Sequence, residues 1–140
     1  MKRLAILTPL VALATTLIPS SVVFAQPAGD EVLLQMQQAS RKQDIRALTT
    51  LLPAIQGHPL EVWGHYWALK ARLSSATAQE VEDFLQRWRG TYQEDRLRND
   101  WLLLLGQRRN WAEFERLHTE FRMRDAEQLR CYALAIASIG

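Results

Sequence analysis

Residues 95–134 read DRLRNDWLLLLGQRRNWAEFERLHTEFRMRDAEQLRCYAL and predict two amphipathic helices, a short turn and the start of a third helix. Apolar residues of the first helix recur at helical spacing: Leu97, Trp101, Leu104 and Leu105. Those of the second helix do the same: Trp111, Phe114, Leu117 and Phe121. Each helix therefore has one apolar stripe, which another helix must cover. This pattern is typical of one repeat in a longer array of helices.

Capping residues mark where helices begin. Asn110 and Glu113 have the spacing of a capping box, and so do Thr77 and Glu80. Gly90 is the expected stop of the helix that Thr77 opens, because glycine commonly follows a helix C-terminus. Both Thr77 and Asn110 are therefore predicted N-caps.

The same reading extends over the rest of the chain. Further helices are expected at residues 31–40, with Asp30 as N-cap, from about residue 44, at residues 60–73 and from Asp125 onward. Alternate helices start near residues 31, 60, 95 and 125, about thirty residues apart, which is a period of stacked helix hairpins. No segment alternates polar and apolar residues with period two. We expect an all-α fold, a superhelical α-solenoid of short, TPR-like helix hairpins.

The first 25 residues have the features of a secretory signal peptide. Met1-Lys2-Arg3 is a short positive region, residues 4–18 are mostly apolar, and Val23-Phe24-Ala25 has the small residues of a cleavage site. The apolar run is shorter than the roughly twenty residues that span a bilayer. The sequence predicts a signal peptide at residues 1–25, a partial superhelical domain at 26–140, a periplasmic location and no stable membrane insertion after cleavage.

The charge and cysteine content restrict the partners. Removal of Lys2 and Arg3 from the 17 Lys and Arg leaves 15, which balance the 15 Asp and Glu. A neutral, exported chain gives no reason to expect a nucleic-acid partner. The single cysteine, Cys131, lies in an apolar helical run, and we expect it to be a buried structural thiol.

No catalytic, cofactor-binding or metal-binding residue can be assigned. The three histidines, His58, His65 and His118, lack metal-ligand spacing. The adjacent or nearby acids are interpreted as caps or solvated side chains: Glu82-Asp83, Glu94-Asp95 and Glu113-Glu115. The arginines at 96, 98, 108 and 109 are interpreted as a solvated face, the alternative being contact with an anionic cell-wall polymer or a partner domain.

The five tryptophans lie on apolar stripes, where core packing is the ordinary role. Tryptophan and tyrosine rings also stack on sugars. Trp63 and Tyr66 are therefore weak candidates for contact with a glycan.

An ordered set of short motifs resembles the soluble lytic murein transglycosylases. The pieces are His58-Pro59-Leu60 with Tyr66-Trp67-Ala68-Leu69, the helix from Val81 to Trp88, Arg96-Leu97-Arg98 with Trp101-Leu102, Arg109-Asn110-Trp111, and Leu129-Arg130-Cys131-Tyr132-Ala133. Their order and spacing agree with that family over about residues 57–137, and the signal peptide agrees too.

The resemblance implies a U-shaped helical scaffold that precedes a lysozyme-like catalytic domain. Members of the family cleave the MurNAc-β-1,4-GlcNAc bond of peptidoglycan and leave a 1,6-anhydroMurNAc end, using a Glu in a Glu-Ser motif. This chain has no Glu-Ser dipeptide. We expect an N-terminal scaffold fragment that lacks the catalytic domain and acts on peptidoglycan only through the intact protein. The alternative is a small exported TPR-like adaptor that binds a protein partner.

Overall fold

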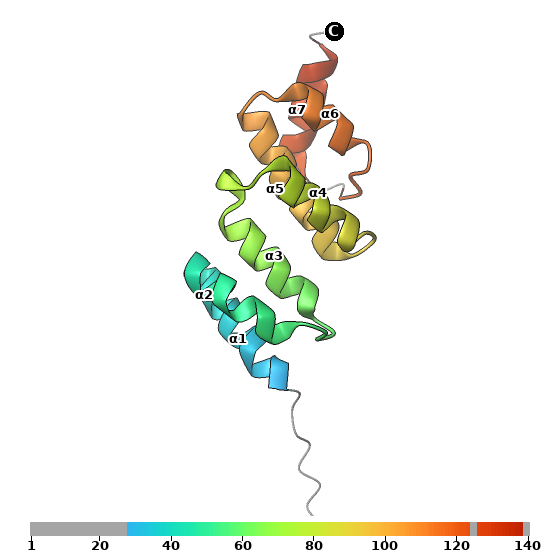
Figure 1. The fold of residues 1–140 in the computed structure, drawn as a ribbon. Helices are drawn as coiled ribbons and strands as arrows, with labels where there is room; N and C mark the ends of the chain where they lie inside the picture. Colours follow the sequence, from blue (N-terminus) through green and yellow to red (C-terminus); the bar gives the residue numbers. More distant parts are fainter. Residues whose placement is uncertain (1–27, 124–125, 139–140) are drawn as a thin grey trace, which may run out of the picture.

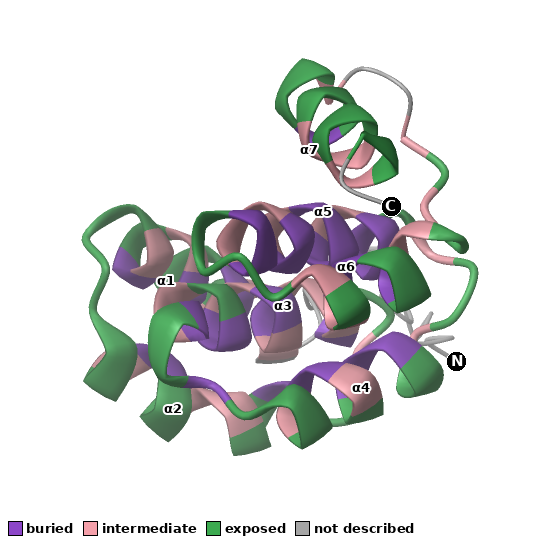
Figure 2. Cartoon of the chain, turned by 90° about the horizontal axis from the view of Figure 1, so that it is seen from above, coloured by how far each residue is buried: buried purple, intermediate pink, exposed green. Residues whose placement is uncertain are grey.

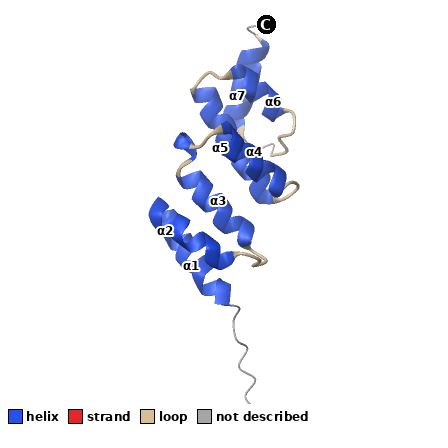
Figure 3. Ribbon diagram, in the orientation of Figure 1, coloured by secondary structure: helices blue, strands red, loops and turns tan. Residues whose placement is uncertain are grey.

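The computed structural model describes residues 28–123 and 126–138, and this part of the chain is all-helical, without a strand (Figure 3). Its α-helices are α1 (Ala28–Arg41), α2 (Ile45–Leu51), α3 (Glu61–Ala71), α4 (Ala78–Arg87), α5 (Tyr92–Gln107), α6 (Trp111–His118) and α7 (Glu127–Ala137). Short 3-10 helices follow α2 and α3, at Leu52–Ile55 and Leu73–Ser75. The all-α prediction is confirmed. The predicted signal peptide lies outside the described residues.

The helices follow one another from α1 and α2 at one end to α7 at the other (Figure 1). Helix α3 packs against α1 on one side and α5 on the other, and α5 packs against α7. The even-numbered helices pack beside this row, since α2 contacts α1 and α3, while α4 and α6 contact α5. Each odd-numbered helix thus contacts the next odd-numbered one.

Apolar burial forms two adjoining cores. The smaller core joins α1, α2 and α3 and consists of Leu33, Met36, Ala39, Leu48, Ile55 and Ala68. The larger joins α3 to α7 and includes Tyr66, Phe84, Leu97, Trp101, Leu102, Phe114 and Leu129. Trp67 is half-buried and packs against both cores. Buried residues lie on the inward faces of α3, α4 and α5, whereas α7 stays mostly exposed (Figure 2).

The two predicted capping boxes have different outcomes. The Thr77 hydroxyl accepts a hydrogen bond from the Glu80 N–H, and the Glu80 carboxylate accepts one from the Thr77 N–H, so this box is confirmed. Asn110 occupies the N-cap of α6, but its side chain makes no capping hydrogen bond. The box at Asn110 is therefore wrong, because the Glu113 carboxylate instead accepts hydrogen bonds from Arg116.

Several helix starts differ from the prediction. Helix α1 begins at Ala28, so Asp30 lies in its first turn and is not its N-cap. Helix α5 begins at Tyr92, three residues before the expected start, because Thr91 accepts a capping hydrogen bond from the Glu94 N–H. Helix α7 has Ala126 as its N-cap, whereas the expected cap, Asp125, lies outside the described residues.

The expected burial of Cys131 is wrong, since its side chain is exposed. Helix α7 buries a different face: Leu129 is fully buried, and Tyr132, Ala133 and Ile136 pack against the larger core. Leu134, by contrast, is 71% exposed. Within the described ranges, no helix is long and apolar enough to cross a bilayer.

Candidate functional site

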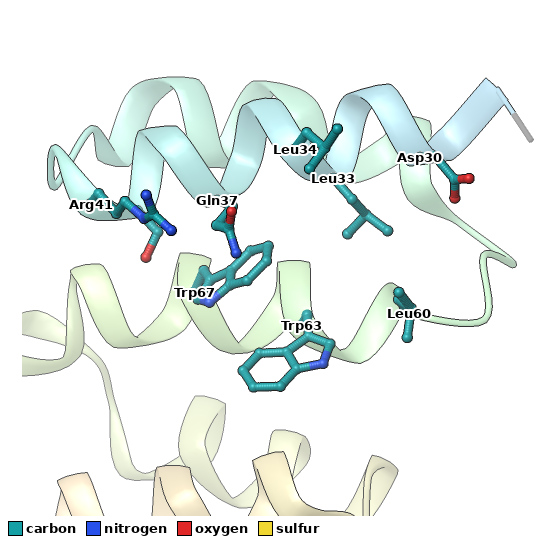
Figure 4. Close-up of a pocket in the computed structure, with 9 residues that line it drawn as sticks. Asp30, Leu33, Leu34, Gln37, Arg41, Leu60, Trp63 and Trp67 are labelled. Atoms are coloured by element: carbon teal, nitrogen blue, oxygen red, sulfur yellow. The ribbon is translucent and has the colours of Figure 1, made fainter. Parts of the chain in front are cut away.

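A groove of about 670 Å³ lies between α1 and α3 (Figure 4). Its lining is mostly apolar: Leu33 and Leu34 come from α1, Trp63 and Trp67 from α3, and Leu60 directly precedes α3. The polar lining residues all come from α1 and are Asp30, Gln37, Ser40 and Arg41. A concave apolar surface with a few polar groups is typical of ligand sites. This groove is the candidate functional site.

Trp63 is the centre of an aromatic cluster beside the groove. Its ring centroid lies 5.6 Å from that of Trp67, one helical turn later, and 6.2 Å from that of Tyr92 on α5. Tyr92 is 58% exposed, and Leu60 and Leu34 on the groove are 51% and 55% exposed. The cluster therefore continues the apolar surface of the groove from α3 toward α5.

The two predicted glycan contacts have different environments. Trp63 is half-buried and lines the groove. Tyr66 is 4% exposed and does not line it. Its hydroxyl donates a hydrogen bond of 2.9 Å to Oδ2 of Asp100 and accepts one of 3.0 Å from Nζ of Lys70. Burial raises the pKa of Tyr66 above its ordinary value. The structure thus brings Trp63, and not Tyr66, to the groove.

Asp30 is held in place at one end of the groove. Its Oδ1 lies 2.7 Å from Nε2 of His58, whose side chain is only 8% exposed. The Leu60 N–H donates to Nδ1 of the same ring at 3.0 Å. Because Nδ1 accepts a hydrogen bond, Nε2 is the nitrogen that carries the proton and donates to Asp30. Asp30 keeps 39% of its side chain exposed, so the fixed carboxylate remains accessible.

Glycine makes this arrangement possible. A Cβ atom at Gly29 would lie 2.6 Å from Cδ2 of His58. Any larger side chain at position 29 would therefore displace the imidazole from Asp30. Sequence reasoning missed Asp30, Trp67 and Tyr92, because their grouping depends on how α1, α3 and α5 pack. The one local signal was the Trp63 and Trp67 pair at i,i+4 spacing.

Of the two interpretations of Glu94-Asp95, a helix start or a solvated face, the structure supports the first, because the pair lies in the first turn of α5 and is not solvated. Glu94 is fully buried and Asp95 is 4% exposed. Arg98, also expected on a solvated face, is 3% exposed and forms an ion pair with Glu94. Burial raises the pKa of Glu94, but hydrogen bonds from Arg98 and Arg122 outweigh it and lower the pKa below the ordinary range. These groups link α5 to the segment after α6.

Two further carboxylates, Glu80 and Glu82, also accept hydrogen bonds from arginine. Hydrogen bonds from Arg72 and Thr77 lower the pKa of Glu80 to about 2. A hydrogen bond from Arg116 lowers the pKa of Glu82. A general acid in glycan cleavage needs a raised pKa, and these shifts have the opposite sign.

A second cavity, of about 300 Å³, lies between α2, α3 and α4. Glu61 lies beside it and connects three groups: it accepts hydrogen bonds from the Gly57 N–H at 2.8 Å and from Arg87 at 2.6 Å, and it lies 3.2 Å from Nε2 of His65. Burial and the Arg87 charge lower the pKa of His65. These contacts join α3 to α4, and they engage both oxygens of the Glu61 carboxylate.

Among the described residues, no group of three or more His, Cys, Asp or Glu side chains could hold a metal ion. Comparison of the chain with models of known protein families, with curated proteins and with solved structures finds no match. The resemblance to lytic transglycosylases and its implied activity stay predictions.

Proposed function

We propose that this chain is the N-terminal part of the helical scaffold of a periplasmic soluble lytic transglycosylase, an enzyme that cleaves peptidoglycan. The observation that carries the proposal is the row of odd-numbered helices, in which α1, α3, α5 and α7 each pack against the next. Such packing is the ordinary construction of an α-solenoid, in which each hairpin contacts only its neighbours.

The positions of the family-like residues support a scaffold role. Tyr66 and Leu69 on α3, Trp101 and Leu102 on α5, and Leu129 on α7 are all buried in the larger core. Residues that resemble a family at buried positions report shared packing, because buried apolar contacts determine how helices stack. The burial of these residues supports the proposal that the resemblance lies in a scaffold.

The lowered pKa values of three carboxylates support the proposal of a scaffold without a general acid. The buried Glu94 is paired with two arginines, and Glu80 and Glu82 each accept a hydrogen bond from one. None of the three has the raised pKa that protonation of a glycosidic oxygen requires.

One observation favours a second candidate function, an exported TPR-like adaptor for a protein partner. Leu34 and Leu60 expose large apolar side chains on the groove, and the exposed Tyr92 lies beside it against Trp63. Exposed apolar clusters of this kind also occur at protein–protein interfaces.

Expression of the full chain in a Gram-negative host tests these functions. N-terminal sequencing of periplasmic material should begin at Gln26. The purified chain should co-sediment with peptidoglycan sacculi and release no anhydromuropeptides. Release of anhydromuropeptides would overturn the assignment of a non-catalytic scaffold. Failure to sediment with sacculi would favour the adaptor.

A further inference from the structure

We propose that the groove between α1 and α3 binds a glycan of β-1,4-linked N-acetylhexosamines, with Trp63 and Trp67 as the stacking surface. This inference rests on the proposed function, because it names the part of the chain that contacts peptidoglycan. Two exposed large apolar side chains, Leu34 and Leu60, line the groove with Trp63, and a third, Tyr92, lies against the Trp63 ring. Such clustering marks a binding surface.

The two walls of the groove differ in chemistry, and the difference matches a pyranose ring. The α3 wall offers the rings of Trp63 and Trp67, on which the apolar C–H face of a sugar can stack. The α1 wall adds Asp30, Gln37, Ser40 and Arg41, which can bond the polar edge of the ring. Among the described residues, the side chains of Gln37 and Ser40 form no hydrogen bond, and both line the groove, where they can bond a ligand.

An amphipathic helix fits these observations less well. Its apolar face would meet the tryptophans, but it would also cover Gln37 and Ser40 without offering them partners. A buried polar group left without a hydrogen bond costs about 1–3 kcal/mol. The mixed lining therefore favours a ligand that carries hydroxyl and amide groups.

The end of the groove at Asp30 suits an acetamido group, because an acceptor and apolar side chains line the same groove, and a plain hydroxyl would use only the acceptor. The Asp30 carboxylate can accept from the acetamido N–H, and His58 holds it in position for that bond. Leu34 and Leu60 offer apolar contact to the acetamido methyl. The α1 wall runs from Asp30 to Arg41, about 16 Å at the helical rise per residue, which is the length of a short oligosaccharide.

Titration of the full chain with chitotetraose tests the proposal, with cellotetraose as the matched glycan that lacks acetamido groups. Isothermal calorimetry should show saturable binding of chitotetraose and much weaker binding of cellotetraose. Trp63→Leu should weaken chitotetraose binding about tenfold, since it removes the stacking surface. Gln37→Ala should weaken it less, and this variant changes no core contact.

Trp111→Leu is the matched control, because Trp111 is half-buried on α6 and stacks near Tyr132, away from the groove. It should bind chitotetraose as the unaltered chain does. His58→Gln should weaken binding of chitotetraose more than binding of cellotetraose, because His58 acts through Asp30. Circular dichroism of each variant must first show an unchanged helical content.

Three results would overturn the proposal: no binding of chitotetraose, equal binding of both glycans, or equal losses in Trp63→Leu and Trp111→Leu. Capture of an amphipathic helical peptide by the groove, with no glycan binding, would also overturn it. Sedimentation with sacculi without binding of chitotetraose would reject the groove and leave the proposed function intact. Binding of chitotetraose without sedimentation would support the groove as a glycan site and reject the proposed function.

Discussion

Arg122 Nη2 lies 2.6 Å from Oε2 of Glu94, although 28 residues separate the two and the Glu94 side chain is 1% exposed. The other carboxylate oxygen pairs with Arg98, whose side chain is 4% exposed. The backbone N–H of Arg122 also donates a hydrogen bond of 3.0 Å to Oδ1 of Asp95. Two consecutive acids at the start of α5 thus hold the segment that leads from α6 to α7.

Replacement of Glu94 by Gln should strongly destabilise the fold. The neutral amide would leave the buried Arg98 charge with the exposed Glu120 as its anionic partner. Loss of one partner of a buried ion pair costs about 3–5 kcal/mol. Urea unfolding at neutral pH measures the change. Glu120→Gln is the matched control, because Glu120 also contacts Arg98, at 3.2 Å, but is 55% exposed. The control should change the free energy of unfolding by less than about 1 kcal/mol.

Glu94 should also contribute to stability in a pH-dependent way. Its pKa in the folded chain is lowered from an ordinary value of 4.5, because the hydrogen bonds from Arg98 and Arg122 outweigh the effect of burial. The folded state therefore binds fewer protons at this site than the unfolded state does. The resulting stabilisation is fully present above about pH 4.5 and is lost as the pH falls through the lowered folded-state pKa.

Urea unfolding of the unaltered chain and of Glu94→Gln, at neutral pH and at several values below pH 4.5, checks this dependence. The difference in free energy of unfolding between the two should be constant above the ordinary pKa and should shrink as the pH falls. A difference that grows on acidification would contradict the sign of the pKa shift.

The two predicted caps provide a matched pair of substitutions. Thr77→Ala removes a reciprocal capping box and should destabilise the chain by about 1 kcal/mol. Asn110→Ala removes no side-chain capping hydrogen bond and should have less than half that effect. Thermal unfolding of both variants measures the ratio. Equal losses would mean that Asn110 caps α6 in solution after all.

The sequence predicted the helices well and the burial of charged groups poorly. Apolar spacing located each helix, because an apolar stripe on a helix is stable only when other helices bury it. Leu97, Trp101 and Leu105 form such a stripe and are buried. Helix α5 starts three residues before the predicted position because Thr91, which has capping-box spacing to Glu94, accepts a hydrogen bond from the Glu94 N–H. Local signals therefore locate the helices, while the spacing of Asn110 and Glu113 shows that a capping pattern alone does not establish a cap.

Burial of Glu94 and Arg98 could not be predicted in the same way. Their spacing of four residues is equally typical of a solvated helix pair. Arg122, from beyond α6, also bonds the carboxylate, and that contact depends on tertiary packing. The groove is a parallel case: Trp63 was identified from sequence, but Asp30 and Tyr92 join it only when α1 and α5 pack on either side of α3.

Gly106 sets how closely α5 and α7 approach. A Cβ atom at this position would lie 2.5 Å from both Cδ2 and Cε2 of Tyr132, far inside van der Waals contact. Gly→Ala within a helix ordinarily stabilises by about 1 kcal/mol through helix propensity. Gly106→Ala should instead destabilise the chain by about 1–3 kcal/mol, because α7 must move away from the larger core.

A double-mutant cycle with Tyr132→Ala separates the clash from other effects. Tyr132→Ala alone should destabilise, since its ring packs near Trp111 and Phe114. In that background Gly106→Ala should be neutral or stabilising, because the ring that blocks the Cβ is gone and only the propensity gain remains. Urea unfolding of the four proteins gives the coupling free energy. A destabilisation by Gly106→Ala that is the same with and without the Tyr132 ring would show that α7 does not pack over Gly106 in solution.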